Sequence, residues 1–156
     1  MLRSNVKPKP GTYALMLSSS EEFPIRIGKL GDMQLQTGIY VYIGSAHGPG
    51  GLSARLGHHL KPTGKPHWHI DYLRAHANPE GAWYCYDSRP WEHVWAECIG
   101  MLPGASIPLA RFGASDCGCK SHLYFFNRQP SRAAFSRMLG ALGHKHPIVR
   151  HFLTQK

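Results

Sequence analysis

The part of the sequence richest in chemically versatile side chains lies between residues 40 and 59. An apolar segment ends in Tyr42-Ile43-Gly44, a glycine-rich turn follows it, and Arg55 and His59 then come four residues apart. Residues with this spacing are neighbours on one face of a helix, so the guanidinium and the imidazole can meet. A phenol, a guanidinium and an imidazole gathered in one place suit a phosphodiester better than a sugar or a peptide. The spacing therefore favours a nuclease as the first hypothesis.

The charge of the chain points in the same direction. Its 156 residues include 18 lysines and arginines against 9 acidic residues, which gives a net charge of +9 and a pI near 9.7. A basic domain attracts polyanions, and nucleic acid is the commonest of them. An alternative is that the excess charge only keeps the protein in solution. The length and the apolar fraction of 42% predict one globular domain with a single core.

The sequence carries no pattern typical of secretion or of a membrane span. Its first ten residues are polar and proline-containing, without the apolar centre of a signal peptide. No stretch approaches the roughly 18 apolar residues needed to cross a bilayer. We therefore expect a cytoplasmic protein without a membrane partner, in which the four cysteines are reduced.

The elements that must position these side chains are a mixture of strands and helices. Apolar or alternating segments predict strands at residues 11–17, 25–30, 33–36, 38–44, 82–86 and 123–126. Helices are expected at residues 52–60, 69–77 and 131–142, with a final helical turn or two at 148–153. A further helix, capped by Asp87 or Ser88, is expected to reach about residue 102. The fold class is therefore α+β, with a small, mainly antiparallel sheet flanked by helices.

Four sites in this layout carry a resemblance to a known family. Gly11-Thr12-Tyr13 on one strand and Tyr42-Ile43-Gly44 on another, followed by Arg55 and His59, resemble the GIY-YIG nuclease superfamily. In that family the two tripeptides lie on neighbouring strands of a three-stranded sheet. The arginine lies on the first helix, and a glutamate on a later helix binds a metal ion. The resemblance thus implies a metal-dependent endonuclease.

A second segment also matches the first tripeptide but does not fit its expected position in the sheet. Gly38-Ile39-Tyr40 spells it literally, but Tyr40 and Tyr42 are two apart on one strand and so share a face. They cannot supply a neighbouring strand, so Gly11-Thr12-Tyr13 is the better match. The separation between Tyr13 and Tyr42 is longer than is usual in the superfamily, and we expect an inserted hairpin at residues 25–36 to account for it.

Two longer signatures resemble one branch of the superfamily. They are the segments at residues 67–73, HWHIDYL, and 112–123, FGASDCGCKSHL. That branch is catalogued as a domain of unknown function, and it occurs alone or attached to DNA-repair glycosylase domains. It implies a nuclease-like domain at residues 11–126, preceded by a lead-in at 1–10 and followed by a basic helical extension of the same domain at 127–156. It also implies DNA as the nucleic acid and a DNA-repair protein as a partner.

The metal-binding carboxylate is expected on the third helix. The family's glutamate stands in a Glu-x-x-x-Ala setting, and residues 92–96, EHVWA, fit it, so the resemblance assigns the metal to Glu92. Mg²⁺ keeps several waters and needs few protein ligands, so one carboxylate suffices, and Mn²⁺ can replace it. Glu97 is the fallback, but it lies about 140° from Glu92 around a helix, so only one of them faces the site. The alternative is that both are solvated charges.

The remaining catalytic roles fall to side chains of the two tripeptides and the first helix. Arg55 is expected to clamp the phosphate, because its planar fork matches phosphate oxygens. By resemblance, Tyr13 or Tyr42 acts as the general base, with Tyr13 favoured, and the other phenol contacts the phosphate. A free phenol has a pKa near 10, so this role needs help from nearby positive charge. His59 is expected to assist proton transfer. The alternatives are packed strand aromatics and a surface arginine.

Four further residues are expected to contact the substrate. Gly44 and Ser45 end the second tripeptide, where a serine hydroxyl can donate to a phosphate. His69 belongs to the first signature, at the edge of the site, although a buried histidine bonded to a neighbour is an equal alternative. His122 belongs to the second signature and is expected either to point into the site or to join Cys117 and Cys119.

Three competing functions follow from these residues. The first is a divalent-metal-dependent endonuclease acting on nucleic acid, with DNA favoured and repair or processing as its setting. The second is a nucleic-acid-binding module on the same fold with little or no cleavage. The third is a small zinc protein built on Cys117, Cys119 and His122, although a structural zinc site usually takes four ligands. A packing role for these cysteines is the alternative to the third.

Overall fold

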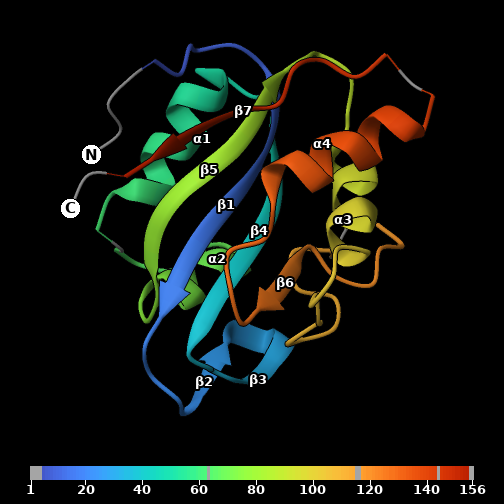
Figure 1. The fold of residues 1–156 in the computed structure, drawn as a ribbon. Helices are drawn as coiled ribbons and strands as arrows, with labels where there is room; N and C mark the ends of the chain where they lie inside the picture. The colour runs from blue at the N-terminus through green and yellow to red at the C-terminus, as the bar shows by residue number, and fades with distance from the viewer. Residues whose placement is uncertain (1–4, 63, 115–116, 144, 155–156) are drawn as a thin grey trace.

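A five-stranded antiparallel sheet runs through the centre of the fold (Figure 1), in the computed structural model that describes residues 5–62, 64–114, 117–143 and 145–154. The strand order is β6-β4-β1-β5-β7. The strands are β1 (Gly11–Ser19), β4 (Gly38–Ala46), β5 (Asn78–Tyr86), β6 (Leu123–Phe126) and β7 (Arg150–Leu153). The expected α+β class and mainly antiparallel sheet are confirmed.

The expected insertion between the tripeptides is a separate two-stranded sheet. Strands β2 (Pro24–Ile27) and β3 (Gly31–Gln34) pair with each other, and the short 3-10 helix η1 (Gly28–Leu30) joins them. The chain therefore reverses at residues 28–30, earlier than the gap between the strands expected at residues 25–30 and 33–36. Gly28 has a φ of +50°, and a Cβ there would lie 3.1 Å from the ring of Tyr72, so glycine allows the hairpin to press against the second helix.

Side chains on both faces of the central sheet are buried. On β1, Tyr13, Leu15 and Leu17 belong to one apolar cluster, while Ala14 and Met16 belong to another on the opposite face. Successive side chains of a strand alternate between faces, so a strand covered on both sides reads as an almost continuous apolar run. This explains why residues 11–17 show little polar alternation.

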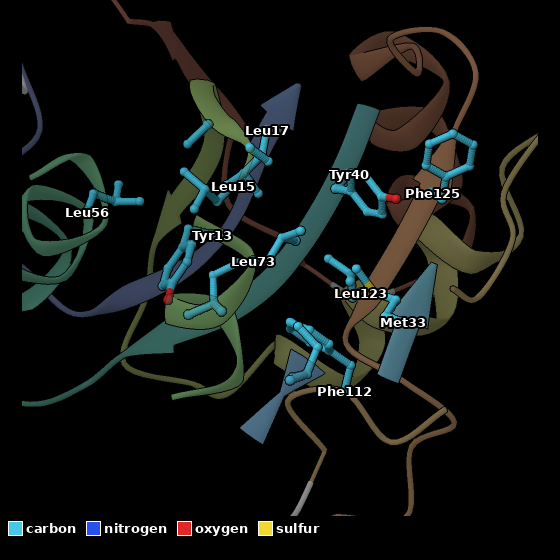
Figure 2. Close-up of a cluster of buried hydrophobic side chains, with 14 of the residues drawn as sticks. Tyr13, Leu15, Leu17, Met33, Tyr40, Leu56, Leu73, Phe112, Leu123 and Phe125 are labelled. Carbon is cyan, nitrogen blue, oxygen red and sulfur yellow. The ribbon is translucent and has the colours of Figure 1, made fainter. Parts of the chain in front are cut away.

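Two helices cover each face of the sheet. Helices α1 (Gly51–Leu60) and α2 (His69–Arg74) lie on the Tyr13 face, where Leu56 and Leu73 point toward the strands (Figure 2). The same cluster includes Phe112, from the segment before β6. Helices α3 (Glu92–Gly100) and α4 (Arg132–Ala141) lie on the other face, with Trp95 and Phe135 fully buried. The sheet thus separates α1 and α2 from α3 and α4 (Figure 1).

Two expectations about the second half of the chain are wrong. Helix α3 begins at Glu92 and not near residue 88, because the Asp87 carboxylate accepts bonds from the Arg89 backbone N–H and the Trp91 indole and so folds a turn. Residues 150–153 form β7, a strand paired with β5, and not helical turns. Pro147 discourages a continuing helix, and β5 offers an open edge to the segment that follows. The C-terminal extension is therefore a helix followed by a strand.

Across the described part of the chain, every helix is too short or too polar to cross a lipid bilayer. The four cysteines all lie in this part, and each is a free thiol.

Candidate active site

The register of β1 against β4 brings the two tripeptides together. Tyr13 lies directly opposite Gly44, and the ring centroids of Tyr13 and Tyr42 are 6.3 Å apart. Gly44 lets the Tyr13 phenol lie across its backbone, because a Cβ at this position would come within 2.4 Å of the Tyr13 hydroxyl oxygen. Gly44 was expected to contact the substrate; in the structure it provides the space that a phenol occupies.

Replacement of Gly44 by alanine is expected to displace the Tyr13 phenol. The new methyl group cannot coexist with the hydroxyl at its present position, so the ring must move by an ångström or more or the strands must separate. We expect a loss of about 1–3 kcal/mol in the free energy of unfolding. Urea denaturation of wild type and Gly44→Ala measures it. Gly57→Ala is the control, because nothing lies within 4 Å of a Cβ there, and an equal effect of both changes would contradict the argument.

Helix α1 delivers His59 to the Tyr13 hydroxyl. Gly50 and Gly51, with φ of +82° and +55°, turn the chain into the helix, and His59 lies in its last turn. The Nε2 atom of His59 lies 2.7 Å from the Tyr13 hydroxyl oxygen. Burial, with the charge of Arg74 as the next cause, lowers the pKa of His59 to about 3, so the imidazole is neutral at physiological pH. A neutral imidazole can accept the phenolic proton through Nε2.

Arg55 lies beside both phenols, one turn before His59 on α1. Burial raises the pKa of Tyr13 and of Tyr42, and the Arg55 charge acts in the opposite direction on both. The guanidinium carbon lies 4.7 Å from the ring centroid of Trp68, in a cation–π contact that restrains the side chain. Trp68 was not predicted from the sequence to belong to the site. Its position between two histidines just before a helix was the only available signal.

Glu92 reaches the phenols from the opposite side of the sheet. It is the first residue of α3, its side chain is 22% exposed, and its charge raises the pKa of Tyr42, second only to burial. Burial opposes ionisation of Glu92 itself, but its contacts with His122 and Ser45 outweigh this effect, so the pKa of Glu92 lies below the usual value. Glu92 is therefore a carboxylate at neutral pH. Glu97 lies further along α3, on an exposed groove beside Met101.

Ser45 and His122 hold the Glu92 carboxylate. The Oε2 atom of Glu92 lies 2.7 Å from Nδ1 of His122, a close contact that is not well aligned for a hydrogen bond. The Nε2 atom of the same imidazole lies 3.5 Å from Sγ of Cys117. His122 therefore connects the carboxylate to the cysteines. Nδ1 thus faces the Glu92 carboxylate, and Nε2 faces the Cys117 thiol.

His69 lies outside this group and supports it indirectly. Burial lowers the pKa of His69, so its imidazole is neutral, and its Nδ1 accepts a hydrogen bond of 2.8 Å from the Gly113 backbone N–H. The neighbouring Phe112 ring packs edge-on against Tyr42, with centroids 6.1 Å apart. His69 thus anchors the segment that supports Tyr42, in line with the alternative of a hydrogen-bonded histidine.

Asp71 organises the segment that carries Trp68. Its carboxylate accepts hydrogen bonds of 2.9 Å from the backbone N–H groups of His67 and Trp68. It also lies 3.4 Å from Arg74 and 3.5 Å from Nε2 of His58. The His58 side chain is half-exposed. Although burial opposes ionisation of Asp71, these groups lower its pKa, and the carboxylate fixes Trp68 against Arg55.

One comparison with known proteins returned a match. The model of a family described as a domain of unknown function, DUF123, matches residues 12–144, a span that contains every side chain of the site. No curated protein and no solved structure matches the chain. Ser115 and Asp116, which belong to the second signature, lie outside the described residues.

Proposed function

The chain belongs to the DUF123 family, and from the geometry of its site we propose that it is a divalent-metal-dependent endonuclease of the GIY-YIG type. Its substrate would be nucleic acid, with DNA preferred. One observation carries the proposal: two phenols, a guanidinium and an ionised carboxylate interact at one end of the sheet although they come from four different elements. This set matches what hydrolysis of a phosphodiester requires.

Arg55 is proposed to hold the phosphate. Its guanidinium is restrained by Trp68 at 4.7 Å and half-exposed, so it can meet a substrate with little loss of side-chain freedom. A phosphate bound by Arg55 would lie next to Tyr42. The negative charge that develops on its oxygens in the transition state would then face a fixed cation.

The residues present fit a hard divalent cation at Glu92. The carboxylate is ionised, partly exposed and next to a phenol, and Mg²⁺ is commonly bound by one carboxylate together with waters and substrate phosphates. When bound, Mg²⁺ or Mn²⁺ would neutralise the Glu92 charge that now raises the pKa of Tyr42 and would stabilise negative charge on the phosphate.

The two phenols differ in exposure, and this changes the roles proposed for them. Tyr13 is fully buried, whereas Tyr42 is partly exposed, so Tyr42 is the better placed of the two phenols to meet an attacking water. We therefore prefer Tyr42 as the general base over Tyr13, which the sequence favoured. Tyr13 and His59 form a pair behind it, in which Nε2 can take the phenolic proton.

The remaining parts of the proposal concern the surroundings of the protein. The net charge of +9 favours association with a nucleic-acid backbone. Four free thiols suit the reducing conditions of the cytoplasm. A DNA-repair protein remains the proposed partner.

A nicking assay tests the proposed activity. Wild-type protein should convert supercoiled plasmid to the nicked form in Mg²⁺ or Mn²⁺, and EDTA should stop the reaction. Labelled DNA and RNA oligonucleotides, offered in parallel, identify the preferred substrate. Binding of these oligonucleotides without cleavage in either ion would overturn the proposal and favour the nucleic-acid-binding module.

A further inference from the structure

A second group of side chains with metal-binding chemistry lies beside the candidate active site. It consists of His93 from α3, Cys117 and Cys119 from the segment before β6, and His122. One ligand atom from each residue lies within 4.8 Å of the other three. We propose that these four residues form a structural zinc site that links Cys117, Cys119 and His122 to α3.

The distances suit a tetrahedral zinc ion. With Zn–S near 2.3 Å and Zn–N near 2.0 Å, the ligand atoms of a tetrahedron are separated by about 3.3–3.8 Å. Sγ of Cys117 and Nε2 of His122 are already 3.5 Å apart. The remaining pairs, at no more than 4.8 Å, need to close by about 1.5 Å at most, which side-chain rotations supply. Two thiolates would balance the charge of Zn²⁺.

His93 supplies the fourth ligand that a structural zinc site at these cysteines requires. The sequence offers only three ligands within six residues, and a structural zinc site takes four. His93 lies 24 residues before Cys117 and comes close only because α3 packs beside this segment. Four protein ligands fill the coordination sphere, so the site would be structural and would not activate water.

Hydrogen bonds hold the described residues on either side of the two cysteines. The Arg111 backbone N–H donates to the Lys120 carbonyl, and the His122 backbone N–H donates to the Phe112 carbonyl, both at 2.7 Å. The Arg111 guanidinium also donates to the Cys119 carbonyl at 2.6 Å, and the Cys117 backbone N–H reaches the Ala114 carbonyl at 3.4 Å. None of these bonds joins the two thiols to α3, and a metal ion shared with His93 would add that link.

Glu92 lies where a zinc-bound histidine usually has a carboxylate partner. Histidine ligands of zinc usually offer their other nitrogen to a carboxylate, which fixes the ring and strengthens its basicity. Here Nε2 of His122 faces the cysteines and Nδ1 lies 2.7 Å from Glu92. The zinc ion would therefore fix the His122 imidazole, which contacts the Glu92 carboxylate. It is distinct from the oxygen site proposed for Mg²⁺, because its ligands are thiols and imidazoles.

Metal analysis of the purified full-length chain tests the zinc site without reference to cleavage. Wild-type protein should contain about one zinc per chain, and Co²⁺ in its place should give tetrahedral d–d bands with thiolate charge-transfer absorption. The double variant Cys117→Ser/Cys119→Ser should lose the zinc. Glu92→Gln should keep it with an affinity lower by about 10–100-fold.

Two controls separate a metal site from a general effect on folding. Cys98→Ala removes a buried thiol of α3 outside the group, and His47→Ala removes an exposed histidine, so both should retain zinc. His93→Ala serves if the double variant does not fold, because His93 is exposed and its loss should release zinc from a folded chain. Wild type that takes up neither zinc nor Co²⁺, or a disulfide between Cys117 and Cys119, would overturn the inference. A wild type that binds zinc but cleaves nothing would refute the proposed activity alone.

Discussion

Replacement of Arg55 by alanine is expected to reduce metal-dependent cleavage by about 10³-fold, the scale on which a transition-state arginine acts in phosphoryl transfer. The change removes the guanidinium that lies beside both phenols and packs on Trp68. Nucleic-acid binding should weaken far less, because one charge out of a net +9 is lost. Single-turnover cleavage rates and binding isotherms, measured on one labelled oligonucleotide, separate the two effects.

The matched control for this change is Arg137→Ala. Arg137 is exposed on α4, on the opposite side of the sheet from α1, and its loss changes the net charge by the same amount. Its cleavage rate should equal that of wild type within a few-fold. An Arg55→Ala protein that cleaves as fast as the Arg137→Ala protein would remove Arg55 from the mechanism. Arg55→Lys should recover only part of the rate, because a lysine cannot form the planar fork.

Acidification is expected to destabilise the protein through His59. Its pKa is about 3 in the folded chain and near 6.5 when unfolded, because burial disfavours the imidazolium. Between these values the unfolded chain binds a proton that the folded chain does not, so the free energy of unfolding rises with pH. The contribution is complete above the unfolded pKa and declines as pH falls toward 3, by about 1.4 kcal/mol per pH unit.

Urea denaturation near pH 7 and near pH 5 measures this effect. Wild type should lose about 2 kcal/mol between them through His59 alone, and His59→Gln should lack that part of the loss. His69 and His146 also have lowered pKa values through burial, but their contributions are common to both proteins and cancel in the comparison. His47→Gln, at an exposed position, should follow wild type. Parallel pH dependence of wild type and His59→Gln would show that His59 titrates normally in the folded chain.

The parts of the fold predicted from sequence are those set by local pattern. Residues 11–17 and 38–44 are apolar runs long enough to be central strands, and the polar–apolar alternation at 25–27 marks the inserted hairpin. The segment at 150–153 has only two polar and two apolar residues, so its own sequence does not decide between helix and strand. The open edge of β5 decides, and that edge exists only after the sheet has formed.

The same distinction holds for the candidate site. Spacing on one helix predicted that Arg55 and His59 share a face, and the structure brings both to the phenols. The roles of Trp68 and His93 could not be predicted from the sequence, because each depends on a contact with a residue distant in the chain. Trp68 packs on Arg55, and His93 faces His122. The contact of Ser45 with Glu92 could not be predicted for the same reason, because it joins a strand to a helix distant in the chain.

The packing of Arg55 on Trp68 gives the site an optical reporter of its own. The other three tryptophans, Trp83, Trp91 and Trp95, are 5%, 7% and 0% exposed, whereas Trp68 is 37% exposed. A dissolved quencher such as iodide therefore reaches the indole of Trp68 before the others. Any anion that draws the guanidinium away from this ring changes its emission, so fluorescence follows occupancy of the site in real time, before any bond is broken.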